Sequence, residues 1–327
     1  MKFLLRGCII LVLVLAWIWG GLALYFSGPG SSLVKTLIVF AFGALLPITF
    51  LLSRSFLRGL FICFLYVVVL FVWWNNLQPT NDKDWAADVA RISHGEIIGD
   101  KLIMKNVRDF RYTDVSTFEE RWQSREYDFN NLQGLDLFLS YWASDNIAHI
   151  ILSWDFGDNG HLAISIETRK DKTQEYSAIK GFFKQFELSY VAADEQDIIK
   201  LRTNYRKERV YLYRLKTSKE NGRALLEDYL KEMNRLVEEP DFYNALTRNC
   251  ATTVHLHVEA IHPDETIPLD WRLIFSGHLD ELMYEYQAIK EMELPFEELR
   301  KKSRVDLRMQ KYSDGNFSEI MRQAPDE

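Results

Sequence analysis

The chain has 327 residues, of which 48% are hydrophobic and 26% charged, enough for one domain of ordinary size and an additional segment. Its formal net charge is −7 at pH 7 and its sequence pI is about 5.6. A chain with this acidic balance lacks the basic surface by which proteins bind nucleic acid. We therefore exclude nucleic acid as a partner.

Three apolar runs without a charged residue lie near the N-terminus, at residues 7–26, 37–52 and 60–74. A helix needs about 20 residues to cross the hydrocarbon core, with a lower limit of about 17. The first run meets this length alone and the others meet it with their flanks, so we predict a three-helix transmembrane anchor over residues 1–78. A cleaved signal peptide is the alternative for the first run, but two more spans follow it and no small-residue cleavage site does.

The basic residues at the helix ends predict the orientation of the anchor. Lys2 and Arg6 precede the first helix, Arg54 and Arg58 join the second to the third, and Lys35 alone lies between the first two. The positive-inside rule then places the N-terminus in the cytoplasm and the rest of the chain, after the third helix, on the far side of the membrane.

Residues 76–85 read as a polar linker, and residues 79–265 as an α+β domain in which strands precede helices. Glycine-rich turns at 99–100 and 157–160 predict two hairpins, over 96–107 and 149–169. A capping-box pattern predicts a short helix over 116–122. Further strands are expected at 185–191 and 210–215, and helices at 194–205, 221–239 and 250–261. Residues 266–327 form a charged, partly helical tail whose end, 316–327, we expect to be disordered.

Cys250 is the only thiol of the outer domain, because Cys8 and Cys63 lie in the membrane runs. In an oxidising compartment a lone cysteine is either a buried inert thiol or a reactive one. Asn249 is a good N-cap, which places Cys250 in the first turn of a helix. Free backbone N–H groups there favour the thiolate form and form an oxyanion hole.

A nucleophilic cysteine needs a base, and two histidines compete for this role. We favour His161, which begins a strand directly after Gly160, over His149 on the preceding strand. In the strand that His161 begins, Ala163, Ser165 and Glu167 share its face. A zinc site built from Cys250, His255, His257 and His262 is the metal-binding alternative, although His255 and His257 point to different sides of a helix.

Several segments resemble the Lnb N-terminal periplasmic domain family. They are GHLAIS at 160–165, YNALTRNC at 243–250, and RYTDVSTFEERW, IAHIILSWDF and LRTNYRKERVYLYRL elsewhere in the domain. The family is similar to the circularly permuted papain-like enzymes, which include NlpC-type amidases. In that group a strand histidine precedes a cysteine at a helix N-terminus. The resemblance implies a permuted papain-like domain with Cys250 as nucleophile, His161 as general base and Asn249 beside them.

A third, orienting residue usually lies on the next strand in that group, and Glu175, Tyr176 and Glu187 are available. The resemblance also implies an activity, since Lnb proteins are lipoprotein N-acyltransferases. An acyl chain would pass from a membrane phospholipid through a thioester on Cys250 to the α-amino group of a lipoprotein, without a cofactor. The lipid bilayer is then a partner, and we expect a multi-pass protein of the bacterial inner membrane with its C-terminal domain in the periplasm.

Two other classes of function remain open. A cysteine hydrolase, either an amidase or a lipase, would use the same residues. A non-enzymatic membrane-anchored binding module would keep Cys250 in its core. Alkylation separates the last class from the other two, because a structural thiol resists iodoacetamide in the folded protein.

Overall fold

The computed structural model describes residues 2–264, 268–290, 292–312 and 315–323. Its N-terminal part consists of helices α1 (Lys2–Ser27), α2 (Ser32–Leu52) and α3 (Phe56–Asn75). Each is long and apolar enough to cross a membrane, which confirms the predicted spans. The helices pack through Trp17 and Phe42, whose rings stack at 4.3 Å, and through Gly20, where any side chain would meet Leu70.

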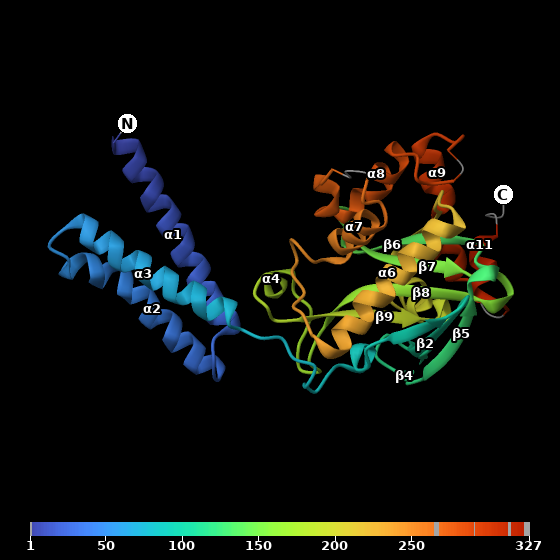
Figure 1. The fold of residues 1–327 in the computed structure, drawn as a ribbon, viewed down its shortest axis with the longest axis horizontal. Coiled ribbons are helices and arrows are strands. Elements are labelled where there is room, and N and C mark those ends of the chain that lie inside the picture. The colour runs from blue at the N-terminus through green and yellow to red at the C-terminus, as the bar shows by residue number, and fades with distance from the viewer. Residues whose placement is uncertain (1, 265–267, 291, 313–314, 324–327) are drawn as a thin grey trace.

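The described domain that follows α3 is built on an eight-stranded, mostly antiparallel sheet with helices on both faces, so the α+β class is confirmed (Figure 1). The strand order is β1-β2-β9-β8-β7-β6-β10, with β5 pairing to β2, and the β2–β9 pair is parallel. The strands are β1 (His94–Ile98), β2 (Lys101–Arg108), β5 (Trp122–Asp128), β6 (Gly134–Ser144), β7 (Ile147–Asp155), β8 (His161–Arg169), β9 (Glu187–Ala193) and β10 (Arg209–Arg214). Both predicted hairpins are present, as β1–β2 and β7–β8.

The helix predicted over residues 116–122 is wrong. A separate two-stranded sheet, β3 (Arg111–Tyr112) with β4 (Phe118–Glu119), occupies this segment. The carboxylate of Asp114 accepts a hydrogen bond from the backbone N–H of Ser116 and reverses the chain. Phe118 then stacks on Phe110, with ring centroids 5.0 Å apart. Ser116 therefore serves a turn and not a helix cap, because one aromatic contact outweighs a local helix signal that has no apolar periodicity behind it.

The two faces of the sheet carry separate apolar cores. One core packs under α6 (Lys219–Glu238) and α7 (Cys250–Ile261), and it includes Leu162, Ile164 and Ile166 of β8. The other packs under α5 (Glu195–Lys200), α10 (Asp306–Met309) and α11 (Phe317–Arg322), and it includes Ala163. The predicted alternation of β8 is thus confirmed.

The remaining helical elements are α4 (Ala178–Gly181), α8 (Leu279–Glu285) and α9 (Phe296–Ser303), a π-helical turn at Leu201–Tyr205, and 3-10 turns at Ala87–Val89, Phe129–Asn131, Gly157–Asn159, Trp271–Leu273 and Ser276–His278.

The C-terminal tail packs on the sheet, so disorder is the wrong prediction for residues 316–323. Phe317 and Met321 of α11 are buried in the second core. The guanidinium of Arg322 contacts the carboxylates of Asp136 at 2.7 Å and Glu195 at 2.6 Å. The charged composition of the segment suggested a solvated tail and gave no sign of these buried contacts. The last four residues of the predicted disordered end, 324–327, lie outside the described residues.

Residues 76–85, predicted as a linker, are bound to the surface of the domain. The Asn81 side chain donates to the backbone carbonyls of Leu236 and Val237 at 2.9 Å and accepts from Arg169 at 2.7 Å. The guanidinium of Arg169 also lies over the Trp85 ring, 4.2 Å from its centroid. The chain between the anchor and the domain therefore has a fixed path.

Candidate active site

Cys250 is the first residue of α7, and Asn249 caps that helix as predicted. The Asn249 side-chain oxygen accepts hydrogen bonds from the N–H groups of Ala251 (2.8 Å) and Thr252 (2.9 Å), and the Thr252 hydroxyl accepts from the Asn249 N–H (3.0 Å). This reciprocal pair is a capping box. The cap occupies the N–H groups of Ala251 and Thr252, and the Thr253 N–H donates to the Asn249 carbonyl. In this first turn the Cys250 N–H therefore remains to donate to an acceptor outside the helix. The expected oxyanion hole therefore retains a single donor from the helix.

His149, and not His161, is the histidine beside Cys250. Its ring shares a hydrogen bond with the Cys250 thiol. Its Nε2 lies 2.6 Å from the Ser165 hydroxyl and 3.1 Å from Oε1 of Glu167. The Ser165 hydroxyl also donates to Glu167, at 2.7 Å. Strands β7 and β8 and the start of α7 thus bring together a thiol, an imidazole and a carboxylate, in the order that thiol catalysis uses.

The charges of this cluster reinforce one another. Burial disfavours the protonated form of His149, but the Glu167 carboxylate and the hydrogen bonds with Cys250 and Glu167 outweigh it and raise the pKa of His149 to about 9. Burial likewise disfavours a charged Glu167, but His149, Arg202 and Ser165 hold the pKa of its carboxyl well below the usual value. At neutral pH the site therefore holds an imidazolium beside a carboxylate, next to the Cys250 sulfur.

This raised pKa predicts a loss of stability in mild alkali. The imidazolium of His149 stabilises the folded state fully below the ordinary histidine pKa of 6.5, and this contribution is lost as the pH rises through about 9. We expect wild type to exceed His149→Gln in thermal midpoint at pH 6, and the difference to shrink by pH 10. The same difference should be small at every pH in a Glu167→Gln background. A difference that does not depend on pH would contradict the ion pair.

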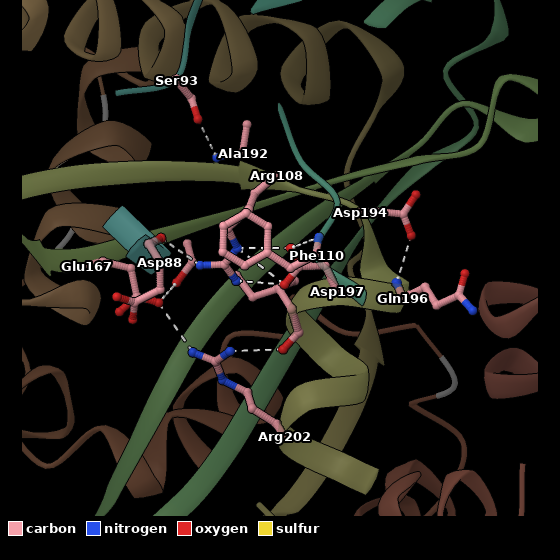
Figure 2. Close-up of polar contacts among 12 residues, drawn as sticks. Asp88, Ser93, Arg108, Phe110, Glu167, Ala192, Asp194, Gln196, Asp197 and Arg202 are labelled. Atoms are coloured by element: carbon pink, nitrogen blue, oxygen red, sulfur yellow. Dashed lines mark hydrogen bonds and ion pairs between the residues drawn. The ribbon is translucent and has the colours of Figure 1, made fainter. Parts of the chain in front are cut away.

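Arg202 fixes the far side of Glu167. Its Nη2 lies 3.2 Å from Glu167 Oε1, and its Nη1 donates to the carbonyl of Ile198 at 2.9 Å (Figure 2). Arg202 belongs to the π-helical turn Leu201–Tyr205, a rare backbone form that is frequent at functional sites. Only 6% of the Arg202 side chain is exposed. The carboxylate that holds His149 is thus itself held by a buried cation.

The predicted pairing of His161 with Cys250 is wrong. His161 lies opposite Asp155 at the turn end of the β7–β8 hairpin, with Nε2 3.5 Å from the Asp155 carboxylate. It lines a cavity of about 740 Å³ together with Glu195 and Arg322. Asp155 is six residues beyond His149 on β7, and six residues of strand span about 20 Å. The strand start after Gly160 is real, but it lies at the end of the sheet away from the cysteine.

The sequence analysis did not include Glu167 among the candidates for the orienting residue. The hairpin register pairs Asp155 with His161 and Ile151 with Ser165, so two more residues in each direction lead to His149 and Glu167. This register was available from the predicted turn. Of the three nominated residues, Glu175 is exposed and Glu187 is buried in an ion pair with Lys83 at 2.6 Å.

Tyr176, the third candidate for the orienting residue, does lie near Cys250. Burial, and then the negative charge of a Cys250 thiolate, raise the pKa of Tyr176, and its hydroxyl shares a hydrogen bond with Tyr243.

His257, one of the histidines of the zinc alternative, contacts the Tyr190 hydroxyl at 2.6 Å and the Asp228 carboxylate at 2.7 Å through its two ring nitrogens. Both nitrogens therefore have protein partners, and His257 is part of the packing between α7, α6 and β9.

Comparison with known proteins finds a family match for part of the chain. Residues 118–277, which include β7, β8 and the start of α7, match the family model of the Lnb N-terminal periplasmic domain. No curated protein and no solved structure shows significant similarity to the chain. The family and the apolar helices α1–α3 together fit a membrane-anchored protein with a domain of periplasmic type. Through residues 118–277, the chain is similar to the Lnb N-terminal periplasmic domain family.

Proposed function

We propose that the protein is a thiol-dependent acyltransferase that moves an acyl chain from a membrane phospholipid, through a thioester on Cys250, to the α-amino group of a lipoprotein. The observation that carries the proposal is the contact of Cys250 with His149, which Glu167 holds from the next strand. Serine–histidine and cysteine–histidine enzymes combine a nucleophile, a base and an orienting group in this way. The histidine still precedes the cysteine in the chain, as in the permuted papain-like enzymes that the family resembles.

The first half-reaction forms the thioester. The Cys250 thiolate attacks the ester carbonyl carbon of the phospholipid, a C–S bond forms, and the carbonyl oxygen becomes an oxyanion that accepts from the Cys250 N–H. The intermediate collapses, the C–O bond to the glycerol oxygen breaks, and the His149 imidazolium gives its proton to that oxygen. A lysophospholipid leaves, and His149 is neutral.

The second half-reaction returns the enzyme to its starting state. The α-amino nitrogen of the lipoprotein attacks the thioester carbonyl, and neutral His149 takes the proton that the nitrogen loses. The C–N bond forms, the C–S bond breaks, and the thiolate is restored beside an imidazolium. Throughout both steps Glu167 keeps Nε2 of His149 in place, which leaves the other ring nitrogen for these proton transfers.

The proposal includes a location. With the N-terminus of α1 in the cytoplasm, as the positive-inside rule predicts, the domain lies in the periplasm and the anchor in the bacterial inner membrane. Both lipid substrates then stay in the bilayer in which α1–α3 are embedded. A protease-protection experiment on spheroplasts tests this topology independently of the chemistry.

The intact mass of the full-length protein, measured after incubation with phospholipid vesicles, tests the chemistry. We expect a fatty-acyl adduct that hydroxylamine removes in wild type and in His161→Ala, and no adduct in Cys250→Ser. A diacylated lipopeptide should then discharge the adduct with a gain of one acyl chain in the peptide. Discharge to water alone would replace the transferase with a hydrolase. No adduct, together with a folded-state thiol that resists iodoacetamide, would make Cys250 structural and refute the enzyme.

A further inference from the structure

A band of exposed apolar side chains lies beside the cysteine site. Trp142 of β6, Tyr176, Ile179 and Phe182 in and beside α4, and Leu246 are 41% to 58% exposed. The Trp142 and Tyr176 rings touch edge to face, with centroids 5.6 Å apart. We call these five residues the apolar rim. Soluble domains seldom expose a contiguous apolar patch unless it contacts a partner or a membrane.

The apolar rim is connected to Cys250 through the chain before α7. The Ala245 N–H donates to the Gly181 carbonyl of α4 at 3.2 Å, which places Leu246 beside α4. The Ala245 carbonyl in turn accepts from the side chain of Asn249, the cap of the cysteine helix, at 3.0 Å. Tyr176 of the rim interacts electrostatically with the Cys250 sulfur. Whatever covers the rim therefore also lies close to Cys250.

The membrane helices end beside the same rim. The Phe26 ring, in the last turn of α1, stacks on Phe183 at 5.1 Å, and Lys184 donates to the Trp74 carbonyl near the end of α3 at 2.9 Å. Phe183 directly follows Phe182 of the rim. Figure 1 shows α4 on the side of the domain that faces α1–α3, and α11 at the opposite end. Because α1 and α3 leave the hydrocarbon core at these contacts, the bilayer surface lies at the level of α4.

We propose that the apolar rim inserts into the interfacial zone of the adjacent leaflet, where the acyl chains and glycerol backbone of a phospholipid are its occupant. Tryptophan and tyrosine are the side chains that prefer this zone. Lys180 of α4 lies among the rim residues, and its ammonium group suits the phosphates of the headgroups. The contact with the bilayer is independent of the chemistry at Cys250; the statement that the inserted lipid is the acyl donor rests on the proposed function.

Photo-crosslinking of the full-length protein in vesicles of phosphatidylethanolamine and phosphatidylglycerol tests the contact. A benzophenone side chain replaces Ile179 in one variant and Leu307 in the other, both in a Cys250→Ser background. Leu307 is the matched control because it is 56% exposed but lies on α10, which packs against α11 at the far end of the domain. We expect phospholipid adducts at position 179, at least tenfold above those at position 307.

The outcomes separate this inference from the proposed function, because the variants cannot form an acyl-enzyme. Equal or absent crosslinking at position 179 would refute insertion even if wild type becomes acylated. Strong crosslinking at position 179 without acylation of wild type would establish the membrane face and refute the chemistry. The rate of iodoacetamide labelling in detergent, measured on the position 179 variant with Cys250 restored, should match wild type and so show that the replacement keeps the folded site.

Discussion

Replacing His149 by alanine is expected to slow acyl-adduct formation on Cys250 by about 10²- to 10⁴-fold, the usual contribution of a positioned acid or base. Two losses act together. The sulfur loses the positive charge beside it, and in the proposed reaction the leaving glycerol oxygen loses its proton donor. The rate of the hydroxylamine-labile mass increase measures the whole step. The rate of iodoacetamide labelling measures the first loss alone.

His161→Ala is the matched control, because it removes the same side chain from the same hairpin at the other end. It should leave both rates close to wild type. The reverse result, a slow His161 variant and a normal His149 variant, would show that the base is not the histidine that contacts Cys250. Glu167→Gln should fall between wild type and His149→Ala, since it keeps the shape of the orienting group and removes its charge.

Replacing Asp197 by alanine is expected to destabilise the folded domain by about 3–5 kcal/mol, the cost of leaving a buried charge without its partner. Asp197 accepts hydrogen bonds from Nε of Arg108 at 2.9 Å, from Nη2 of Arg108 at 2.8 Å and from the Phe110 N–H at 2.7 Å (Figure 2). The two side chains are 4% and 0% exposed. Their contact ties the end of β2 to α5, directly before the π-helical turn that carries Arg202.

The thermal midpoint of the detergent-solubilised protein, followed by circular dichroism, measures this effect. The double variant Arg108→Met with Asp197→Leu should be more stable than Asp197→Ala, because no unpaired charge stays behind. Lys101→Ala, which breaks an ion pair with Glu126 on the surface, should leave the midpoint unchanged. If Asp197→Ala behaves like the surface variant, the buried pair does not stabilise the domain.

Local signals in the sequence predicted the elements of the site, and tertiary contacts determined how they meet. The Asn249 cap predicted the start of α7 at Cys250, because capping depends on three neighbouring residues. The choice between His149 and His161 depends on which end of a hairpin faces a helix that begins some ninety residues later. No local pattern carries that information. The register of the turn does place Glu167 across from His149, but it also places Asp155 across from His161, so it does not decide between the two histidines.

The same division explains the other errors. The pattern of residues 116–122 fits a helix start, but Phe110, outside the window, determines that Phe118 lies in a strand. The charges of residues 316–323 suggest a solvated tail, but Asp136 and Glu195 are the buried partners that Arg322 needs. In both cases a contact distant in sequence outweighs the local preference.

The fixed path of residues 76–85 connects the domain rigidly to the membrane helices. A flexible linker of ten residues would instead let the domain sample a wide volume above the bilayer, and its end-to-end distance would follow that of a random coil. Here Asn81 and Trp85 hold the segment against Arg169, while Phe183 and Lys184 hold the other side of the domain against α1 and α3. The height and tilt of Cys250 relative to the membrane helices are therefore built into the chain, and under the proposed function the lipid reactants would meet it by diffusing within the plane of the bilayer.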